Sequence, residues 1–159
     1  MAESQSPQDR SRLEPPTSGE AARVMIADDN FDHVATTALL LESQGYVVRG
    51  LPSGGALLAQ FEAFRPHVVI LDIGMPGLTG YDVARALRAS AMGSEVLLMA
   101  LTAYDGQTDR MLSQLAGFDY HLVKPADPNS MLAIVRDYVA GNRPMRVHVF
   151  REEDPTRGL

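Results

Sequence analysis

The chain has 159 residues, of which 45% are hydrophobic, so it is long enough for one compact domain with a buried core. The chain has 14 Lys and Arg residues and 20 Asp and Glu residues, which gives a net charge of -6. This negative charge and the lack of a local basic patch in the sequence argue against a nucleic-acid-binding surface. The absence of cysteine excludes disulfides and thiol nucleophiles and fits a cytoplasmic protein, while the longest apolar run, residues 96–101, is far short of the roughly 20 residues of a membrane helix.

The first segment and the elements that follow it differ sharply in composition. Residues 1–21 are rich in Ser, Gln, Glu and Pro, offer little to bury and are predicted to be a disordered leader. Beyond them, five short aliphatic runs predict strands at residues 24–27, 46–49, 67–72, 95–102 and 120–124. Each run is followed by apolar residues at helical spacing, and the predicted helices reach Gly45, Pro66, Leu87, Gly117 and Gly141.

The third run, residues 68–71, is apolar without alternation, which is typical of a central parallel strand covered by helices on both faces. Five successive strand–helix units over residues 22–141 predict an α/β domain with a doubly wound, five-stranded parallel sheet. Residues 142–159 are too few for a second domain. Residues 146–150 alternate like a strand, so this extension is either a frayed tail or a strand added to a sheet edge in this or a neighbouring molecule.

Polar residues stand where four of the predicted strands end. The first strand ends in Asp28 and Asp29, the third in Asp72, the fourth in Thr102 and the fifth in Lys124. Ligands of an open parallel sheet bind outside the carboxyl ends of its strands, so these side chains are expected to converge. Carboxylates at such short distances repel one another unless a cation neutralises them, and hard oxygen ligands suit Mg²⁺. Each residue alone has an ordinary explanation, such as a helix cap or a solvated lysine, but their coincidence predicts a magnesium site.

Four segments carry a family resemblance: Asp28-Asp29, residues 69–80, Leu101-Thr102-Ala103 and Val123-Lys124-Pro125. With their spacing, they resemble the CheY-like receiver, or phosphoacceptor, domain of bacterial two-component response regulators over about residues 22–141. The resemblance implies the flavodoxin-like (βα)5 fold. Residues 71–88 are most similar to receivers attached to hybrid histidine kinases, which leaves open a stand-alone receiver, a phosphorelay shuttle or a fragment of a larger kinase.

The resemblance implies a phosphoryl-transfer site with a bound cation. Asp72 is expected to be the nucleophile that takes a phosphoryl group from a histidine kinase or a histidine phosphotransfer protein. Asp28, Asp29, Asp72 and the backbone carbonyl of Gly74 are expected to hold Mg²⁺. The chain is then a signalling phosphoacceptor with only self-phosphorylation and self-dephosphorylation chemistry, not an enzyme acting on other substrates.

The resemblance also implies phosphate ligands and a switch. Lys124, the Thr102 hydroxyl and the Ala103 amide are expected to bind phosphoryl oxygens, and the peptide bond between Lys124 and Pro125 is expected to be cis. Switching in the family involves Thr102 and an aromatic side chain three residues before the lysine. His121 stands at that position, so it either takes part in the switch or is a solvent-facing strand histidine.

Several alternatives remain beside a receiver that switches contacts with a downstream protein or forms a homodimer. One is a degenerate receiver that acts as a phosphorylation-independent scaffold. Another is a Mg²⁺-dependent phosphohydrolase, which is disfavoured because Gly74 stands where such enzymes carry a second acid. A flavodoxin-type flavin or nucleotide binder is disfavoured because the acids would repel phosphate.

Tyr104 is expected to screen an aspartyl phosphate from water and so to slow the loss of the phosphoryl group.

Overall fold

The computed structural model describes residues 16, 17, 19–103 and 106–142. Its strands are β1 (Arg23–Ala27), β2 (Val47–Leu51), β3 (Val68–Asp72), β4 (Leu97–Thr102) and β5 (Tyr120–Val123). Its helices are α1 (Phe31–Glu42), α2 (Gly54–Phe64), α3 (Gly80–Ala89), α4 (Gln107–Ala116) and α5 (Pro128–Val139), with a short 3₁₀ turn η2 (Met92–Ser94). The five predicted strand–helix units are confirmed.

The boundaries of all five strands differ from those predicted by one or two residues, most of all in β2 and β4. β4 begins at Leu97 rather than at Glu95, because η2 precedes it and Glu95 still has helical dihedral angles (φ -113°, ψ -2°). β2 covers Val47–Leu51 rather than residues 46–49, and it pairs with β1 along that whole length. β5 ends at Val123, so Lys124 directly follows its strand rather than ending it, whereas Asp72 and Thr102 are the last residues of β3 and β4 as predicted.

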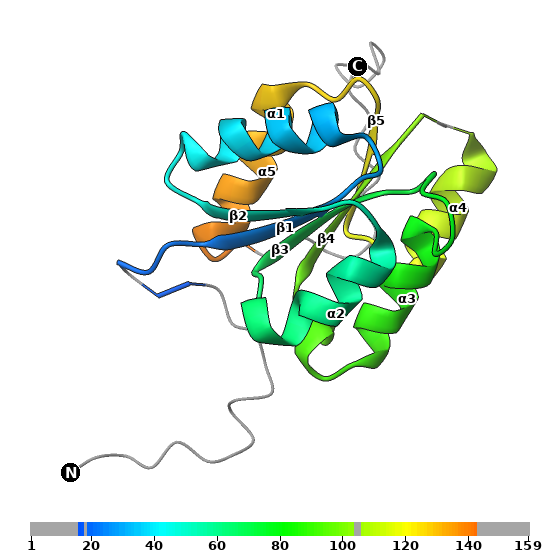
Figure 1. Cartoon of the computed structure of the whole chain (residues 1–159), viewed down its shortest axis with the longest axis horizontal. Helices are drawn as coiled ribbons and strands as arrows, with labels where there is room; N and C mark the ends of the chain where they lie inside the picture. The colour runs from blue at the N-terminus through cyan, green and yellow to red at the C-terminus, as the bar shows by residue number, and fades with distance from the viewer. Residues whose placement is uncertain (1–15, 18, 104–105, 143–159) are drawn as a thin grey trace.

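The five strands form one parallel sheet in the order β2-β1-β3-β4-β5. Every residue of the central strand β3 is buried, as its unbroken apolar run predicted, whereas the edge strand β2 is largely exposed. Helices α1 and α5 cover one face of the sheet, and α2, α3 and α4 cover the other (Figure 1). The fold is therefore the doubly wound α/β arrangement predicted from the sequence.

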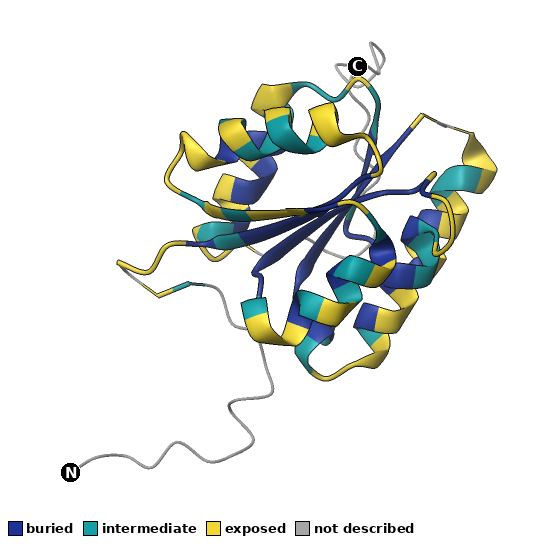
Figure 2. Cartoon of the chain, viewed as in Figure 1, coloured by how far each residue is buried: buried dark blue, intermediate teal, exposed yellow. Residues whose placement is uncertain are grey.

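The central strands are buried between the helices on both faces of the sheet (Figure 2), and two apolar clusters fill the space between them. Successive side chains of a strand point to opposite faces, so β3 contributes to both clusters. Val69 and Leu71 pack with residues of α2 and α3, while Val68 and Ile70 pack with residues of α1 and α5. Because helices cover both faces of the central strands, a ligand is expected to reach this part of the sheet at the strand ends.

Polar caps fix where most of the helices begin. The side chains of Asn30, Ser53, Thr79 and Asp127 accept hydrogen bonds from the first-turn amides of α1, α2, α3 and α5. Helix α4 follows Gly106 and has no such side-chain cap. The cap at Asn30 matters most for the site, because it directly follows the acid pair at the end of β1.

A buried polar network, called here the amino-end network, joins the strands at the edge where they begin. Arg88 pairs with Asp119 Oδ2 at 2.8 Å, and the same oxygen accepts the Leu98 amide at 2.9 Å. The Arg88 guanidinium also donates to the carbonyl oxygens of Gly93, Ser94, Val96 and Gly117. Nearby, the buried His67 accepts the Arg23 amide at Nδ1 (2.9 Å), and burial, helped by the Arg23 charge, lowers the pKa of His67 to about 4.

Some predictions fall outside the described residues. These are the strand at residues 146–150 and the role of Tyr104, so both stay predictions, as does the division into leader, receiver and extension. Within the described part of the chain, no helix is both long and apolar enough to span a bilayer.

Candidate functional site

Three carboxylates meet where β1 and β3 end, at what we call the acidic edge of the sheet. One oxygen from each of Asp28, Asp29 and Asp72 lies within 4.8 Å of the others. Asp28 and Asp72 are buried, at 3% and 8% exposure, whereas Asp29 is exposed. The cluster thus has two sheltered acids and one that faces solvent.

Lys124 supplies the positive charge that the structure places against these acids. It follows β5, and its Nζ lies 3.3 Å from Asp28 Oδ2 and 3.4 Å from Asp72 Oδ1. The peptide bond between Lys124 and Pro125 is cis, as expected. One ammonium shared between two carboxylates leaves the acidic edge with excess negative charge.

Local turns hold the two buried carboxylates in place. The Asn30 amide donates to Asp28 Oδ1 at 2.9 Å, and the Gly74 amide donates to Asp72 Oδ1 at 3.1 Å. Each bond spans two residues, so it forms as the chain turns from the strand into its loop. The carboxylates are therefore oriented by the backbone next to them before any ligand binds.

The two buried acids have opposite pKa shifts. Burial raises the pKa of the Asp72 carboxyl, and the Asp28 charge adds to this against the Gly74 amide and Lys124. Burial also acts to raise the pKa of Asp28, but the Asn30 amide and Lys124 outweigh it and lower that pKa. An added cation would therefore favour the ionised form of Asp72 against its raised pKa.

Thr102 ends β4 and Ala103 follows it, at the same edge of the sheet as this cluster. Thr102 is buried at 1% exposure, Ala103 is exposed, and the Lys124 amide donates to the Thr102 carbonyl at 2.8 Å. That bond continues the pairing of β4 with β5, in which Thr102 lies opposite Val123. The main chains that carry Thr102 and Lys124 are therefore locked side by side at the same end of the sheet.

His121 is buried, so its interpretation as a solvent-facing histidine is wrong. Its exposure is 1%, because α4 covers this face of β5, and its Nδ1 lies 2.7 Å from Ser113 Oγ on that helix. The ring is accommodated in the interior because Ser113 satisfies part of its hydrogen-bonding capacity. Whether it takes part in switching stays a prediction.

His33 is a neighbour of the site that the sequence reasoning missed. It lies in the first turn of α1, and its Nδ1 is 3.4 Å from Asp28 Oδ2, with a side chain 54% exposed. The cap at Asn30 sets the direction in which α1 leaves β1 and so brings His33 back over Asp28. One signal in the sequence could have indicated this contact. His33 stands four residues after Asp29, at the start of the helix that follows the acid pair.

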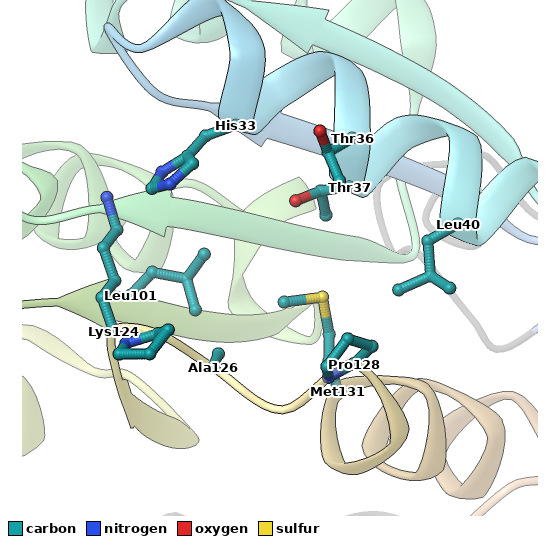
Figure 3. A pocket seen from close by; sticks show the side chains of 10 residues that line it. His33, Thr36, Thr37, Leu40, Leu101, Lys124, Ala126, Pro128 and Met131 are labelled. Carbon is teal, nitrogen blue, oxygen red and sulfur yellow. The ribbon is translucent and has the colours of Figure 1, made fainter.

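A pocket of about 200 Å³ opens beside the cluster, between α1 and the segment that joins β5 to α5 (Figure 3). His33 and Lys124 point into the same space at one end of it, and Leu40, Leu101 and Met131 lie further along. The remaining lining residues are Thr36, Thr37, Pro125, Ala126 and Pro128. One end of the pocket is therefore lined by His33 and Lys124, the two side chains that contact Asp28.

Comparisons with known proteins agree with this geometry. Residues 24–136 match the family model described as the response regulator receiver domain. The chain is 32% identical over 120 residues to protein PilH of Pseudomonas aeruginosa, in a match that covers 76% of this chain and 99% of PilH. It is 32% identical over 114 residues, or 72% of its length, to the DNA-binding response regulator MtrA of Mycobacterium tuberculosis, but spans only 49% of that protein.

Solved structures show the same fold. The chemotaxis protein CheY4 of Vibrio cholerae aligns with a TM-score of 0.71 at 26% identity, over 74% of this chain and 98% of CheY4. The finer likeness to receivers of hybrid histidine kinases stays a prediction.

Proposed function

This chain belongs to the response regulator receiver domain family, a family of phosphoacceptors in two-component signalling, and from that premise we propose that Asp72 accepts the phosphoryl group. The observation that carries this assignment is the place of Asp72 at the end of the central strand, 3.4 Å from Lys124 and beside two further carboxylates. Membership of this family favours neither the phosphohydrolase nor the flavin-binding alternative.

In the proposed reaction, a carboxylate oxygen of Asp72 attacks the phosphorus atom of a phosphohistidine on the donor protein. A P–O bond forms as the P–N bond breaks, and the electron pair of the P–N bond leaves with the donor imidazole. The products are an aspartyl phosphate and an unmodified donor histidine. Since the nucleophile is the ionised carboxylate, a bound cation would assist transfer by favouring that form against the raised pKa of Asp72.

Mg²⁺ is the cation that the donor set at the acidic edge fits. Three clustered carboxylates with one lysine between them give hard oxygen ligands and uncompensated negative charge. Asp28, Asp29, Asp72 and the Gly74 carbonyl would hold the ion. When bound, it supplies charge that neutralises both the carboxylates and the incoming phosphoryl oxygens.

The other residues at the strand ends would bind the transferred group. Lys124 would pair with a phosphoryl oxygen, for which its present distances to Asp28 and Asp72 place it in reach. The Thr102 hydroxyl and the Ala103 amide would take another oxygen. In this account each phosphoryl oxygen is met either by the cation or by a positioned donor.

The family implies contact with a histidine kinase or a phosphotransfer protein. We propose that phosphorylation then changes the contacts of this chain with a downstream protein or with a second copy of itself, in the cytoplasm. The net charge of -6 supports a protein partner rather than nucleic acid.

Intact-mass measurement after incubation with acetyl phosphate tests the proposal. With Mg²⁺, the wild type should gain one phosphoryl group, and the gain should disappear when Mg²⁺ is removed or when Asp72→Asn is used. No gain in the wild type, with Mg²⁺ binding shown separately, would instead favour the phosphorylation-independent scaffold.

A further inference from the structure

The pocket between α1 and the segment that joins β5 to α5 is polar at one end and largely apolar along the rest of its length (Figure 3). Lys124 and His33 form the polar end, and the apolar side chains further along are those of Leu40, Leu101 and Met131. The volume of about 200 Å³ is several times the roughly 30 Å³ that one water molecule takes in the liquid, so a short carbon chain fits inside. These features suit a small ligand with a polar head and an apolar tail.

Lys124 links this pocket to the proposed phosphoryl-transfer site. Its side chain lines the pocket, and its Nζ lies 3.4 Å from Asp72 Oδ1 and 3.3 Å from Asp28 Oδ2. A phosphoryl group that is paired with Lys124 and placed for attack by Asp72 is therefore next to the polar end of the pocket. The leaving group on the phosphorus atom then has the apolar part of the pocket within reach.

The charges around Lys124 decide which head group the ligand carries. A free fatty carboxylate would face the three carboxylates of the acidic edge with a single ammonium to offset them, so it is repelled. A phosphoryl group differs, because Lys124 and the cation proposed for the acidic edge both neutralise its oxygens. The apolar tail therefore belongs to the leaving group of a phosphoryl donor.

We propose that the pocket binds the acyl chain of small acyl phosphates, so that this protein prefers donors with a longer chain than acetyl phosphate, such as butyryl phosphate. This preference rests on the proposed function of Asp72. An Asp72 oxygen attacks the phosphorus atom and forms a P–O bond, while the P–O bond to the acyl group breaks and its electron pair leaves with the carboxylate. The carboxylate leaves in its ionised form, so the step needs no proton.

Phosphorylation rates with the two donors test the preference. Acetyl phosphate and butyryl phosphate both release a simple aliphatic carboxylate, so the ratio of their second-order rate constants reports the binding of the acyl chain. Each buried methylene group favours binding by about four-fold, and the pocket is partly open, so butyryl phosphate with Mg²⁺ should react between about four-fold and fifteen-fold faster. Intact mass against time measures both rates. A ratio of one or below would overturn the preference.

Substitutions on α1 show whether this pocket is the cause. Leu40→Ala removes part of the apolar wall, and Thr36→Phe adds a ring from an exposed position that lines the pocket, so each should lower the rate ratio by about two-fold or more. Leu39→Ala is the matched control, because Leu39 is 68% exposed and lies outside the pocket lining, and it should keep the wild-type ratio. Urea denaturation checks that each variant is folded. An unchanged ratio in Thr36→Phe would overturn the assignment to this pocket.

Binding is measured apart from transfer with the phosphonate analogues of the two donors, in which a methylene group replaces the bridging oxygen. With Mg²⁺, the analogue of butyryl phosphate should shift the NMR signal of the Met131 methyl group, which lines the pocket. The analogue of acetyl phosphate should shift it less. Met92, in the 3₁₀ turn before β4, is the reporter that should not move. No shift at Met131 would overturn the proposal.

The outcomes separate this proposal from the proposed function. If the wild type gains a phosphoryl group from acetyl phosphate but no faster from butyryl phosphate, the proposed function stands and the preference for longer donors is wrong. If neither donor phosphorylates Asp72, both proposals fail.

Discussion

The two ends of the parallel sheet differ in how far their buried charges are compensated by neighbouring groups. In the amino-end network, Arg88 is matched by Asp119 and by four carbonyl groups, so its charge is compensated within the fold. At the acidic edge, Lys124 serves both Asp28 and Asp72, and a third carboxylate lies nearby. Compensated charge is typical of a structural role, whereas excess charge at a strand end is typical of a ligand site.

This contrast predicts different effects of substitutions at the two ends of the sheet. At the acidic edge they should abolish chemistry while the fold keeps its stability. In the amino-end network they should lower stability while the chemistry survives. The predictions below run from the largest expected effect to the smallest.

Asp72→Asn should remove phosphorylation altogether, because no carboxylate remains to attack the donor. Its free energy of unfolding should not fall, since the substitution also removes the repulsion between Asp28 and Asp72. Intact mass and urea denaturation measure the two effects on one sample. A clear loss of stability would show that the acidic edge is compensated after all.

Arg88→Met should lower the free energy of unfolding by about 3–5 kcal/mol, because it removes the guanidinium that pairs with the buried Asp119 carboxylate. Below its melting temperature, the variant should still take up one phosphoryl group. Arg85→Met is the matched control, since the Arg85 pair with Asp82 is largely exposed and should contribute less than about 1 kcal/mol. Similar losses for both arginines would contradict a special role for the network.

His67 gives the amino-end network a pH dependence. The folded state keeps its ring neutral down to a pKa of about 4, whereas the unfolded chain binds a proton near pH 6.5. The unfolded state therefore gains protons first as the pH falls, and stability should decline between about pH 6.5 and 4, by up to roughly 3 kcal/mol from this group. Urea denaturation across that range measures the slope, which should be shallower in His67→Asn. An identical slope in that variant would assign the pH dependence to other groups.

Mg²⁺ should raise the melting temperature of the wild type by a few degrees, because it binds the folded acidic edge and not the unfolded chain. The increase should be much smaller in Asp28→Asn, which lacks one of the buried ligands, and unchanged in Arg85→Met. Differential scanning fluorimetry against a matched series of Na⁺ concentrations separates this effect from general screening. Equal shifts in the wild type and Asp28→Asn would argue against Asp28 as a ligand.

The fold was largely predictable because its signals are local. The apolar run of β3 and the glycines and prolines that end helices are read within one segment, and strand ends in a parallel sheet must share an edge. The gathering of Asp28, Asp29 and Asp72 follows from that rule alone. The match of Lys124 to two of these acids follows from it as well.

The remaining contacts could not be predicted, because they depend on how separate segments pack. Arg88 meets Asp119 only because α3 ends beside the start of β5. His121 lies in a four-residue strand whose Tyr-His-Leu-Val pattern does not show which face is covered, so its burial depends on where α4 rests. His33 reaches Asp28 through the direction of the first turn of α1.

The most direct test of the central claim locates the phosphoryl group on the chain. The wild-type protein is phosphorylated with acetyl phosphate and Mg²⁺, reduced with borohydride, which converts an aspartyl phosphate to homoserine, and mapped by peptide mass spectrometry. We predict homoserine at position 72 and at no other acid of the acidic edge. Homoserine at Asp28 or Asp29 instead, or none at all in a protein that has gained a phosphoryl group, would contradict the account.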